Sequence, residues 1–279
     1  MTLESDRRAT VFWLLLGASA LAGVASVPYL VDIASQVPGM VPGALAHGGR
    51  LYLFTAIQSL LFTLPTAWIG LTLAPRVGLG LLTSPIGVAL RRAIVAGLAM
   101  GVLLVAGSAL AEKHLPQISM RAPAWWKGLL ASLSAGVNEE IWFRLGVMTM
   151  LMVGGAALFG RRSEPGPVDT GSESAPVDTG SESAPVDTGS DPPLASRVPT
   201  WVRWTACVIS ALLFGALHLP QADAITSLTP GVVAYALVGN GILGVLLGWL
   251  YWKHGLLSAM VAHASTDVVL HVVAPLAIP

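Results

Sequence analysis

Long runs of apolar residues, separated by short polar segments, recur along most of the chain. A helix needs about 20 apolar residues to cross a bilayer core of about 30 Å. By this criterion the pattern predicts about seven membrane-spanning helices. They fall at roughly 10–32, 51–74, 93–111, 127–150, 201–219, 231–252 and 255–274. The predicted fold class is therefore all-α: a polytopic transmembrane helix bundle.

Two of these runs leave alternatives open. Arg7 and Arg8 precede the first run, as in a signal peptide, but the run is long for such a segment, and we expect a retained span. The fourth run extends from Trp126 to Gly160, which is too long for one upright span and short for two. It forms either a long tilted helix or a span followed by an interfacial stretch, so the number of spans is open by about one.

Composition supports the membrane assignment. The chain is 54% hydrophobic and only 11% charged, with a mean hydropathy of +0.72, whereas a soluble globular protein has about 25% charged residues. The 15 basic residues are scattered along the chain, which disfavours nucleic-acid binding. The single cysteine, Cys207, excludes a disulfide within the chain and a Cys-x-x-Cys zinc site.

The formal charge of zero conceals an acidic insert at residues 163–193, which holds seven of the 15 acidic residues and no Lys or Arg. The nine residues Val168–Pro176 recur as Val177–Pro185, and a third copy begins at Val186. The composition of Asp, Glu, Ser, Pro and Gly cannot bury a core, so we predict a disordered loop. Its Asp-Thr-Gly triplets match the signature of aspartic proteases, but as repeat units they do not indicate that fold.

The Lys and Arg residues near the span ends predict the orientation. With a cytoplasmic N-terminus, the inner side carries Arg7, Arg8, Arg76, Arg91, Arg92, Arg161, Arg162, Arg197 and Lys253. The outer side then carries only Arg50, Lys113, Arg121 and Lys127. The bias favours an integral membrane protein, expected in the plasma membrane, with its N-terminus in the cytoplasm and its C-terminus outside.

The candidate chemistry begins with two adjacent carboxylates, Glu139 and Glu140, in the fourth run. Ionisable groups inside a membrane span are costly, so each is a functional candidate. Arg144 lies four residues beyond Glu140 on the same helix face, where the two can pair. Glu139 is turned about 100° away and has no evident partner on its own helix. Glu139 therefore remains basic enough to act as a general base near neutral pH.

Two further motifs place ionisable groups in other spans. Phe214 and His218 are four residues apart near the end of the fifth run, and His263 and Asp267 share a helix face in the seventh, which His271 extends. Each alone has an ordinary structural interpretation, a hydrogen-bonded His or a polar pair joining helices. Ionisable groups in lipid are costly unless they face a shared polar interior. Together, these groups therefore predict that the fourth, fifth and seventh helices converge on one polar site able to activate water.

One feature of the predicted spans conflicts with this convergence. His218 lies about 25 Å along its span and His263 only about 12 Å along its own, at a rise of 1.5 Å per residue. Because both spans start on the cytoplasmic side, we expect the fifth helix to begin in the cytoplasm, below the membrane.

In this order, Glu-Glu-x-x-x-Arg, Phe-x-x-x-His and His-x-x-x-Asp resemble the motifs of the CAAX-protease/bacteriocin-processing (CPBP) family, which includes type II CAAX prenyl endopeptidases. The resemblance covers roughly residues 127–272, with the phrases Trp142-Phe-Arg-Leu-Gly146 and Gly248-Trp-Leu-Tyr251. Residues 1–120 add only apolar helices to it. The chain thus divides into N-terminal transmembrane helices (1–120), a catalytic helical core (121–162 and 194–279) and the insert.

The resemblance implies a peptidase in which Glu139 activates water and Glu140 and Arg144 support it. It implies that His218 and His263 bind a metal or stabilise an oxyanion, with Asp267 as orienter. This chain has Asp267 where the prenyl endopeptidases typically carry Asn, which adds a negative charge to the site. A zinc ion held by Glu140, His218 and His263 and a metal-free reaction both remain open.

The expected function is therefore an intramembrane endopeptidase that cleaves a membrane-associated or lipidated peptide or protein. Two alternatives remain: a non-enzymatic immunity or scaffold protein of the same family, and a small carrier that relays protons through its intramembrane Glu, His and Asp. A carrier predicts an internal repeat of topology, and the two halves of the sequence show none.

Overall fold

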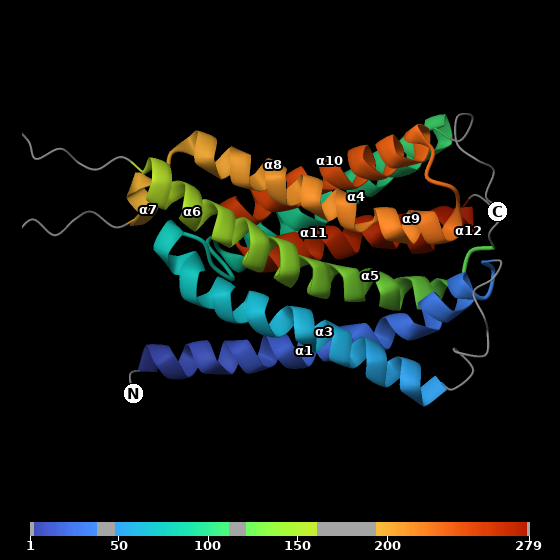
Figure 1. The fold of residues 1–279 in the computed structure, drawn as a ribbon, viewed down its shortest axis with the longest axis horizontal. Helices are drawn as coiled ribbons and strands as arrows, with labels where there is room; N and C mark the ends of the chain where they lie inside the picture. The colour runs from blue at the N-terminus through green and yellow to red at the C-terminus, as the bar shows by residue number, and fades with distance from the viewer. Residues whose placement is uncertain (1–2, 38–47, 112–120, 161–193, 278–279) are drawn as a thin grey trace, which may run out of the picture.

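The computed structural model describes residues 3–37, 48–111, 121–160 and 194–277, and within these ranges all regular structure is helical (Figure 1). The prediction for residues 163–193 lies outside the described residues. The helices are α1 (Leu3–Ala34), α3 (Gly48–Leu73), η1 (Ala74–Val77), α4 (Ile86–Ala111), α5 (Trp125–Glu140), η3 (Ile141–Met148), α6 (Thr149–Phe159), α7 (Leu194–Arg197), α8 (Thr200–Leu217), α9 (Leu219–Ile225), α10 (Pro230–His254), α11 (Leu256–Val268), η4 (Val269–Val273) and α12 (Ala274–Ala277).

Seven spans of the described chain are long and apolar enough to cross a membrane, which confirms the predicted all-α transmembrane bundle. They are Asp6–Ala34, Gly49–Val77, Ile86–Ala111, Trp125–Phe159, Thr200–Ile225, Pro230–His254 and Leu256–Ala277. The fourth span is one continuous helix of 35 residues, formed by α5, η3 and α6. Of the two alternatives for this run, the structure therefore has the long helix.

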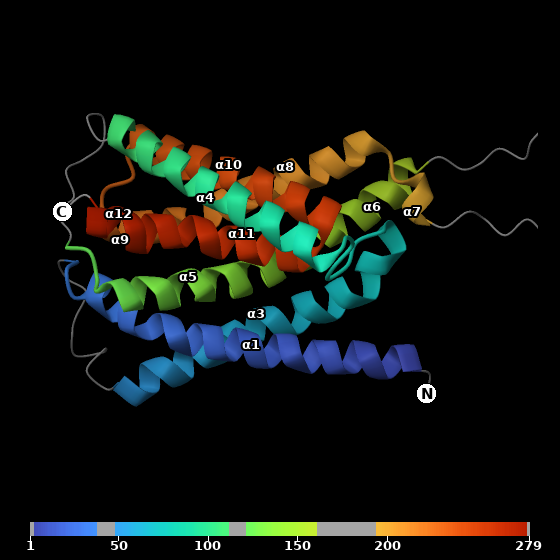
Figure 2. The same ribbon diagram turned by 180° about the vertical axis from the view of Figure 1, so that it is seen from behind.

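Helix α11 lies at the centre of the bundle and packs against α4, α5 and α10. Helices α1 and α3 pair with each other and cover α5 and η3, while α8 packs against α10 (Figures 1 and 2). The start of α1, the end of α6 and the start of α8 lie at one end of the bundle, and the chain's C-terminus lies at the other. An odd number of spans produces this arrangement.

Small residues bring α4 and α11 into close contact. Ala89, Ala93, Gly97 and Gly101 are spaced by four residues along α4 and are all buried. A Cβ atom added at Gly97 would lie 2.3 Å from the carbonyl oxygen of Ala262. In lipid no hydrophobic effect drives helices together, so membrane helices associate through such close backbone packing. The stripe therefore fixes α11 where its polar residues face α5.

The start of α11 is held by the segment that joins α3 to α4. The backbone N–H groups of Leu256 and Leu257 donate to the carbonyl oxygens of Gly80 and Leu81, at 3.0 and 3.1 Å. Gly255 adopts a left-handed φ of 95°, and a Cβ atom there would meet the backbone of Leu81 at 2.6 Å. These bonds satisfy two of the N–H groups that a helix start leaves unpaired.

Candidate active site

The innermost part of the site is a fully buried cluster around Glu140. Its Oε1 accepts a hydrogen bond from His263 Nδ1 at 2.9 Å, and its Oε2 lies 3.3 Å from Arg144 Nε. The predicted pairing of Glu140 with Arg144 on one helix face is thus confirmed. Arg144 Nη2 donates to the carbonyl oxygen of Gly244 at 3.1 Å. This cluster joins α10 and α11 to the continuous helix that α5 and η3 form.

Arg144 lies in η3, a π-helical segment that begins directly after Glu140. Such segments are rare and occur frequently at functional sites, and the sequence pattern did not reveal this one. The guanidinium Cζ lies 4.9 Å from the centre of the Phe214 ring. This cation–π contact offsets the absence, among the described residues, of a hydrogen-bond acceptor for Arg144 Nη1.

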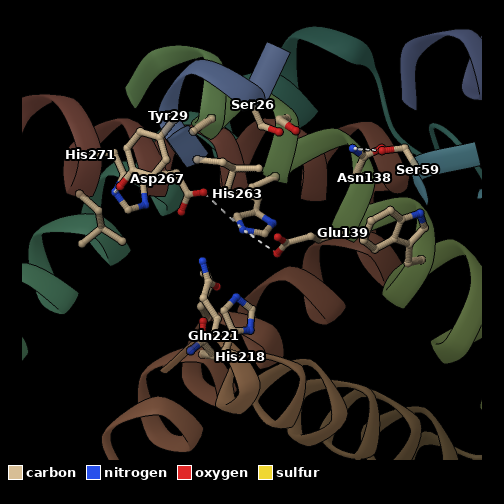
Figure 3. A pocket seen from close by; sticks show the side chains of 18 of the residues that line it. Ser26, Tyr29, Ser59, Asn138, Glu139, His218, Gln221, His263, Asp267 and His271 are labelled. Atoms are coloured by element: carbon tan, nitrogen blue, oxygen red, sulfur yellow. Dashed lines mark hydrogen bonds and ion pairs between the residues drawn. The ribbon is translucent and has the colours of Figure 1, made fainter. Parts of the chain in front are cut away.

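Glu139 points in another direction, into a cavity of the bundle (Figure 3). Its Oε2 lies 3.8 Å from His263 Nε2, and its side chain remains 23% exposed, whereas that of Glu140 is fully buried. No cation of its own helix contacts it among the described residues, as the sequence predicted. The same imidazole thus contacts Glu140 through Nδ1 and faces Glu139 through Nε2.

His218 reaches the same cavity from the end of α8. Its Nδ1 donates to the carbonyl oxygen of Phe214 at 2.9 Å, because a carbonyl can only accept, and Nε2 is left for a ligand. The Phe214 ring packs edge-on against both imidazoles, with centroids 4.8 Å from His218 and 5.7 Å from His263. The predicted meeting of His218 and His263 is therefore observed.

The lengths of α8 and α11 explain how the two histidines meet. His218 follows 18 helical residues from Thr200, whereas His263 lies only seven residues beyond Leu256. Helix α8 starts beside α7, beyond the start of α11 (Figure 1). The helix is long enough to bring both side chains to one level.

Asp267 lies one turn beyond His263 and lines the same cavity. Its Oδ2 is 3.7 Å from His263 Nε2, which is an ionic contact and not a hydrogen bond. The hydrogen bond that orients the imidazole comes from Glu140 instead. The role of Asp267 as orienter stays a prediction.

The cavity has a volume of about 450 Å³, and all seven spans contribute residues to its lining. Figure 3 shows Glu139, His263 and Asp267 on one side and His218 with Gln221 on the other. Its polar lining consists of Ser26, Tyr29, Thr55, Gln58, Ser59, Ser134, Asn138, Glu139, His218, Gln221, Asn240, His263, Asp267 and His271, with Trp142 beside them. The volume is that of a ligand pocket.

The expectation that residues 1–120 add only apolar helices is wrong for the site. Ser19 Oγ donates to Asn138 Oδ1 at 2.6 Å and contacts Thr63 Oγ1 at 2.6 Å, and Thr63 also accepts from Trp142 Nε1 at 2.8 Å. Asn138 directly precedes Glu139 in the chain. The four-residue spacing of Ser59 and Thr63 on α3 was the one sign of this contribution in the sequence. Such hydroxyls, however, often bond to the backbone of their own helix.

At the far end of the cavity, Tyr29 Oη and His271 Nδ1 are 3.1 Å apart. His271 was placed on the His263 face by its spacing, and Tyr29 was not identified. A tyrosine near a span end is ordinarily attributed to the aromatic belt at the membrane interface, so its contribution to the cavity was not recognisable.

The structure gives the zinc hypothesis no support. Glu140 already contacts His263 and Arg144 through its two oxygens, and His263 Nδ1 is occupied by that same bond. Across the described ranges, no three His, Cys, Asp or Glu side chains are placed to hold a metal ion together. The zinc ion stays a prediction, and the reaction proposed below is written for the side chains alone.

The bundle places carboxylates and imidazoles around a cavity between its spans, and the comparison of the sequence with protein families identifies its class. The family model of the Rce1-like type II CAAX prenyl endopeptidases matches residues 121–269, just over half of the chain. The chain belongs to this family, and is a membrane protease by that membership. No curated protein and no solved structure gives a significant match.

Proposed function

We propose that the chain is an intramembrane endopeptidase that hydrolyses a peptide bond of a membrane-associated or lipidated peptide or protein with a water molecule activated by Glu139. The observation that carries this proposal is the position of Glu139. It faces a cavity inside the bundle, beside the imidazole of His263 and across from that of His218, while its neighbour Glu140 is fully buried and paired. A carboxylate placed in this way can accept a proton from a water molecule in the cavity.

In the proposed reaction, Glu139 accepts a proton as the water oxygen attacks the scissile carbonyl carbon. The carbonyl oxygen becomes an oxyanion, which requires donors aimed at it. His263 Nε2 and His218 Nε2 both face the cavity, and in their protonated forms each donates to that oxygen. Collapse of the tetrahedral intermediate breaks the C–N bond, and Glu139 returns its proton to the leaving amine.

The buried cluster supports this geometry. Glu140 fixes the ring of His263 through Nδ1 and is itself fixed by Arg144. Removal of either group would leave the imidazole free to rotate, and a displacement of about 1 Å can cost about 100-fold in rate.

The location of the cavity supports a membrane-bound substrate. The cavity is enclosed by spans of the bundle and is lined by both apolar and polar side chains, which suits a peptide segment delivered from the bilayer. From the distribution of Lys and Arg we propose the plasma membrane, with the N-terminus in the cytoplasm.

The test is a cleavage screen of the purified protein in liposomes, with matched prenylated and unprenylated peptides and mass spectrometry of the products. We expect hydrolysis at one peptide bond. His218→Ala and His263→Ala should each lower turnover severely, because each removes a donor to the oxyanion.

Glu139→Gln, which keeps the side-chain shape, is the inactive control. Cleavage of neither set of peptides would overturn the proposal, and so would equal cleavage by the Glu139→Gln protein. Cleavage of the prenylated set alone would identify the lipid as part of the substrate.

A further inference from the structure

The cavity is lined by a carboxylate that the proposed reaction does not use. Two carboxylates, those of Glu139 and Asp267, line it together with three imidazoles, and no Lys or Arg is among the lining residues. Two cations of the bundle are already paired with other carboxylates: Arg144 with Glu140, and Lys127 with Asp32 at 2.7 Å. Glu139 is needed for the water molecule, so the carboxylate without a function is that of Asp267.

Asp267 is 7% exposed, yet it accepts no hydrogen bond from any described residue. Its one ionic contact, 3.7 Å to His263 Nε2, is longer than a hydrogen bond. A buried charge without hydrogen bonds is costly, and Figure 3 shows this carboxylate turned into the cavity between Tyr29 and His263. Among the described residues the carboxylate has only its ionic contact with His263, so a ligand in the cavity can hydrogen-bond to it.

The groups around Asp267 are of a kind that receives a cation. Gln58, Gln221 and Asn240 add amide groups to the lining, and Tyr29 adds a hydroxyl that bonds with His271. Amide and phenol oxygens accept hydrogen bonds from an ammonium or guanidinium group, and a carboxylate adds a charge-assisted bond. A negatively charged side chain beside Asp267 would meet that carboxylate, and no Lys or Arg is among the lining residues.

We propose that Asp267 recognises a positively charged side chain, Lys or Arg, of the substrate at one of the two residues that flank the scissile bond. This inference rests on the proposed peptidase function and names its substrate class: peptides with a basic residue beside the cleavage point. The position follows from the contacts, because Asp267 and Glu139 face the same nitrogen of His263, at 3.7 and 3.8 Å. A side chain of the residue next to the attacked carbonyl therefore reaches Asp267.

The experiment compares kcat/KM for three membrane-anchored peptides that differ at one flanking residue, Lys, Met or Glu, with each flanking position varied in turn. At one of the two positions we expect the Lys peptide to be cleaved at least roughly tenfold better than the Met peptide, the effect of a charge-assisted hydrogen bond. The Glu peptide should be the poorest. Asp267→Asn should reduce the Lys-to-Met ratio to about one, whatever its effect on absolute turnover.

Asp32→Asn is the matched control, because Asp32 pairs with Lys127 and does not line the cavity; it should keep the wild-type ratio. If Asp267 only orients His263, Asp267→Asn will lower kcat/KM for all three peptides by the same factor, and the proposal is wrong. A wild-type enzyme that cleaves the three peptides equally would overturn it as well.

Binding separates this inference from the proposed function. The Glu139→Gln protein, with Asp267 intact, should bind a fluorescent Lys peptide at least roughly tenfold more tightly than the Met peptide. If the wild-type protein cleaves no peptide but this difference in affinity is found, the peptidase proposal fails and the recognition of a cation stands. Equal affinities would overturn the recognition even where cleavage is observed.

Discussion

Two halves of the polar site differ in how far their charges are paired. In the inner half, Glu140 contacts both Arg144 and His263 Nδ1, and all three side chains are inaccessible or nearly so. In the outer half, Glu139, Asp267 and His218 Nε2 face a cavity, with ionic contacts of 3.7–3.8 Å or none. Helices α5 and α11 contribute to both halves, whereas His218 belongs to the end of α8. In the proposed reaction, therefore, the catalytic base is not one of the most deeply buried charges of the bundle, and we expect those charges to stabilise its structure.

The adjacent residues Glu139 and Glu140 test this division most directly. Glu139→Gln should lower turnover by about 10²- to 10⁴-fold, the usual contribution of general base catalysis, and leave the free energy of unfolding nearly unchanged. Glu140→Gln should instead destabilise the protein, because it leaves Arg144 buried without a counter-charge. The measurements are turnover of a membrane peptide and thermal unfolding in detergent. Unchanged turnover in Glu139→Gln would break the comparison.

Arg144→Ala should give the largest loss of stability. Breaking a buried ion pair by removing one partner costs about 3–5 kcal/mol, and both side chains of this pair are fully buried. The control is Lys127→Ala, which breaks an ion pair whose side chains are 21% and 31% exposed. Such a pair contributes about 0–1 kcal/mol. Equal losses for the two variants, measured by denaturant unfolding in detergent, would mean that the inner half is not a stabilising cluster.

The extent to which this division was predictable varies between its parts. Apolar runs separated by charged segments are enough to define seven spans, and the spacing of Glu140 and Arg144 is enough to predict their pairing. The motifs also brought Glu139, His218 and His263 together correctly. The hydrogen bond from His263 to Glu140 was not predictable, because it depends on how α5 and α11 are rotated toward each other, and spacing within one helix carries no such information.

The contribution of α1 and α3 was missed for a different reason. Ser19, Ser59 and Thr63 are small hydroxyl residues within apolar runs, and a hydroxyl in a membrane helix can bond to its own backbone without any functional consequence. Only the packing of α1 on α5 and of α3 on η3 shows that Ser19 and Ser59 bond with Asn138 and that Thr63 bonds with Ser19. The π-helical turn of η3 likewise has no signature in the pattern of hydrophobic positions.

The position of the outer half depends on the close approach of α4 to α11. Gly97→Ala should destabilise the protein by about 1–3 kcal/mol, the usual cost of overpacking, because the new Cβ would lie 2.3 Å from the Ala262 carbonyl oxygen. Ala262 precedes His263, so turnover should fall too. Gly107→Ala lies on the same helix, where a Cβ atom meets nothing within 4 Å, and it should not destabilise. Equal unfolding midpoints for the two variants would contradict the role of the small-residue stripe.

The smallest effect is expected where the N-terminal helices support the outer half. Ser19→Ala removes the donor to Asn138 Oδ1 and the contact with Thr63, both buried. Leaving a buried acceptor without its donor costs about 1–3 kcal/mol, and a few-fold loss of kcat/KM should accompany it, because Asn138 precedes Glu139 in α5. Thr10→Ala is the control on the same helix. Its hydroxyl bonds to the Asp6 carbonyl at an exposed position, so its effect should stay within about 0.5 kcal/mol. A loss of stability in Ser19→Ala without any change in kcat/KM would confine the network to folding, and would leave the orientation of Glu139 to α11 and η3 alone.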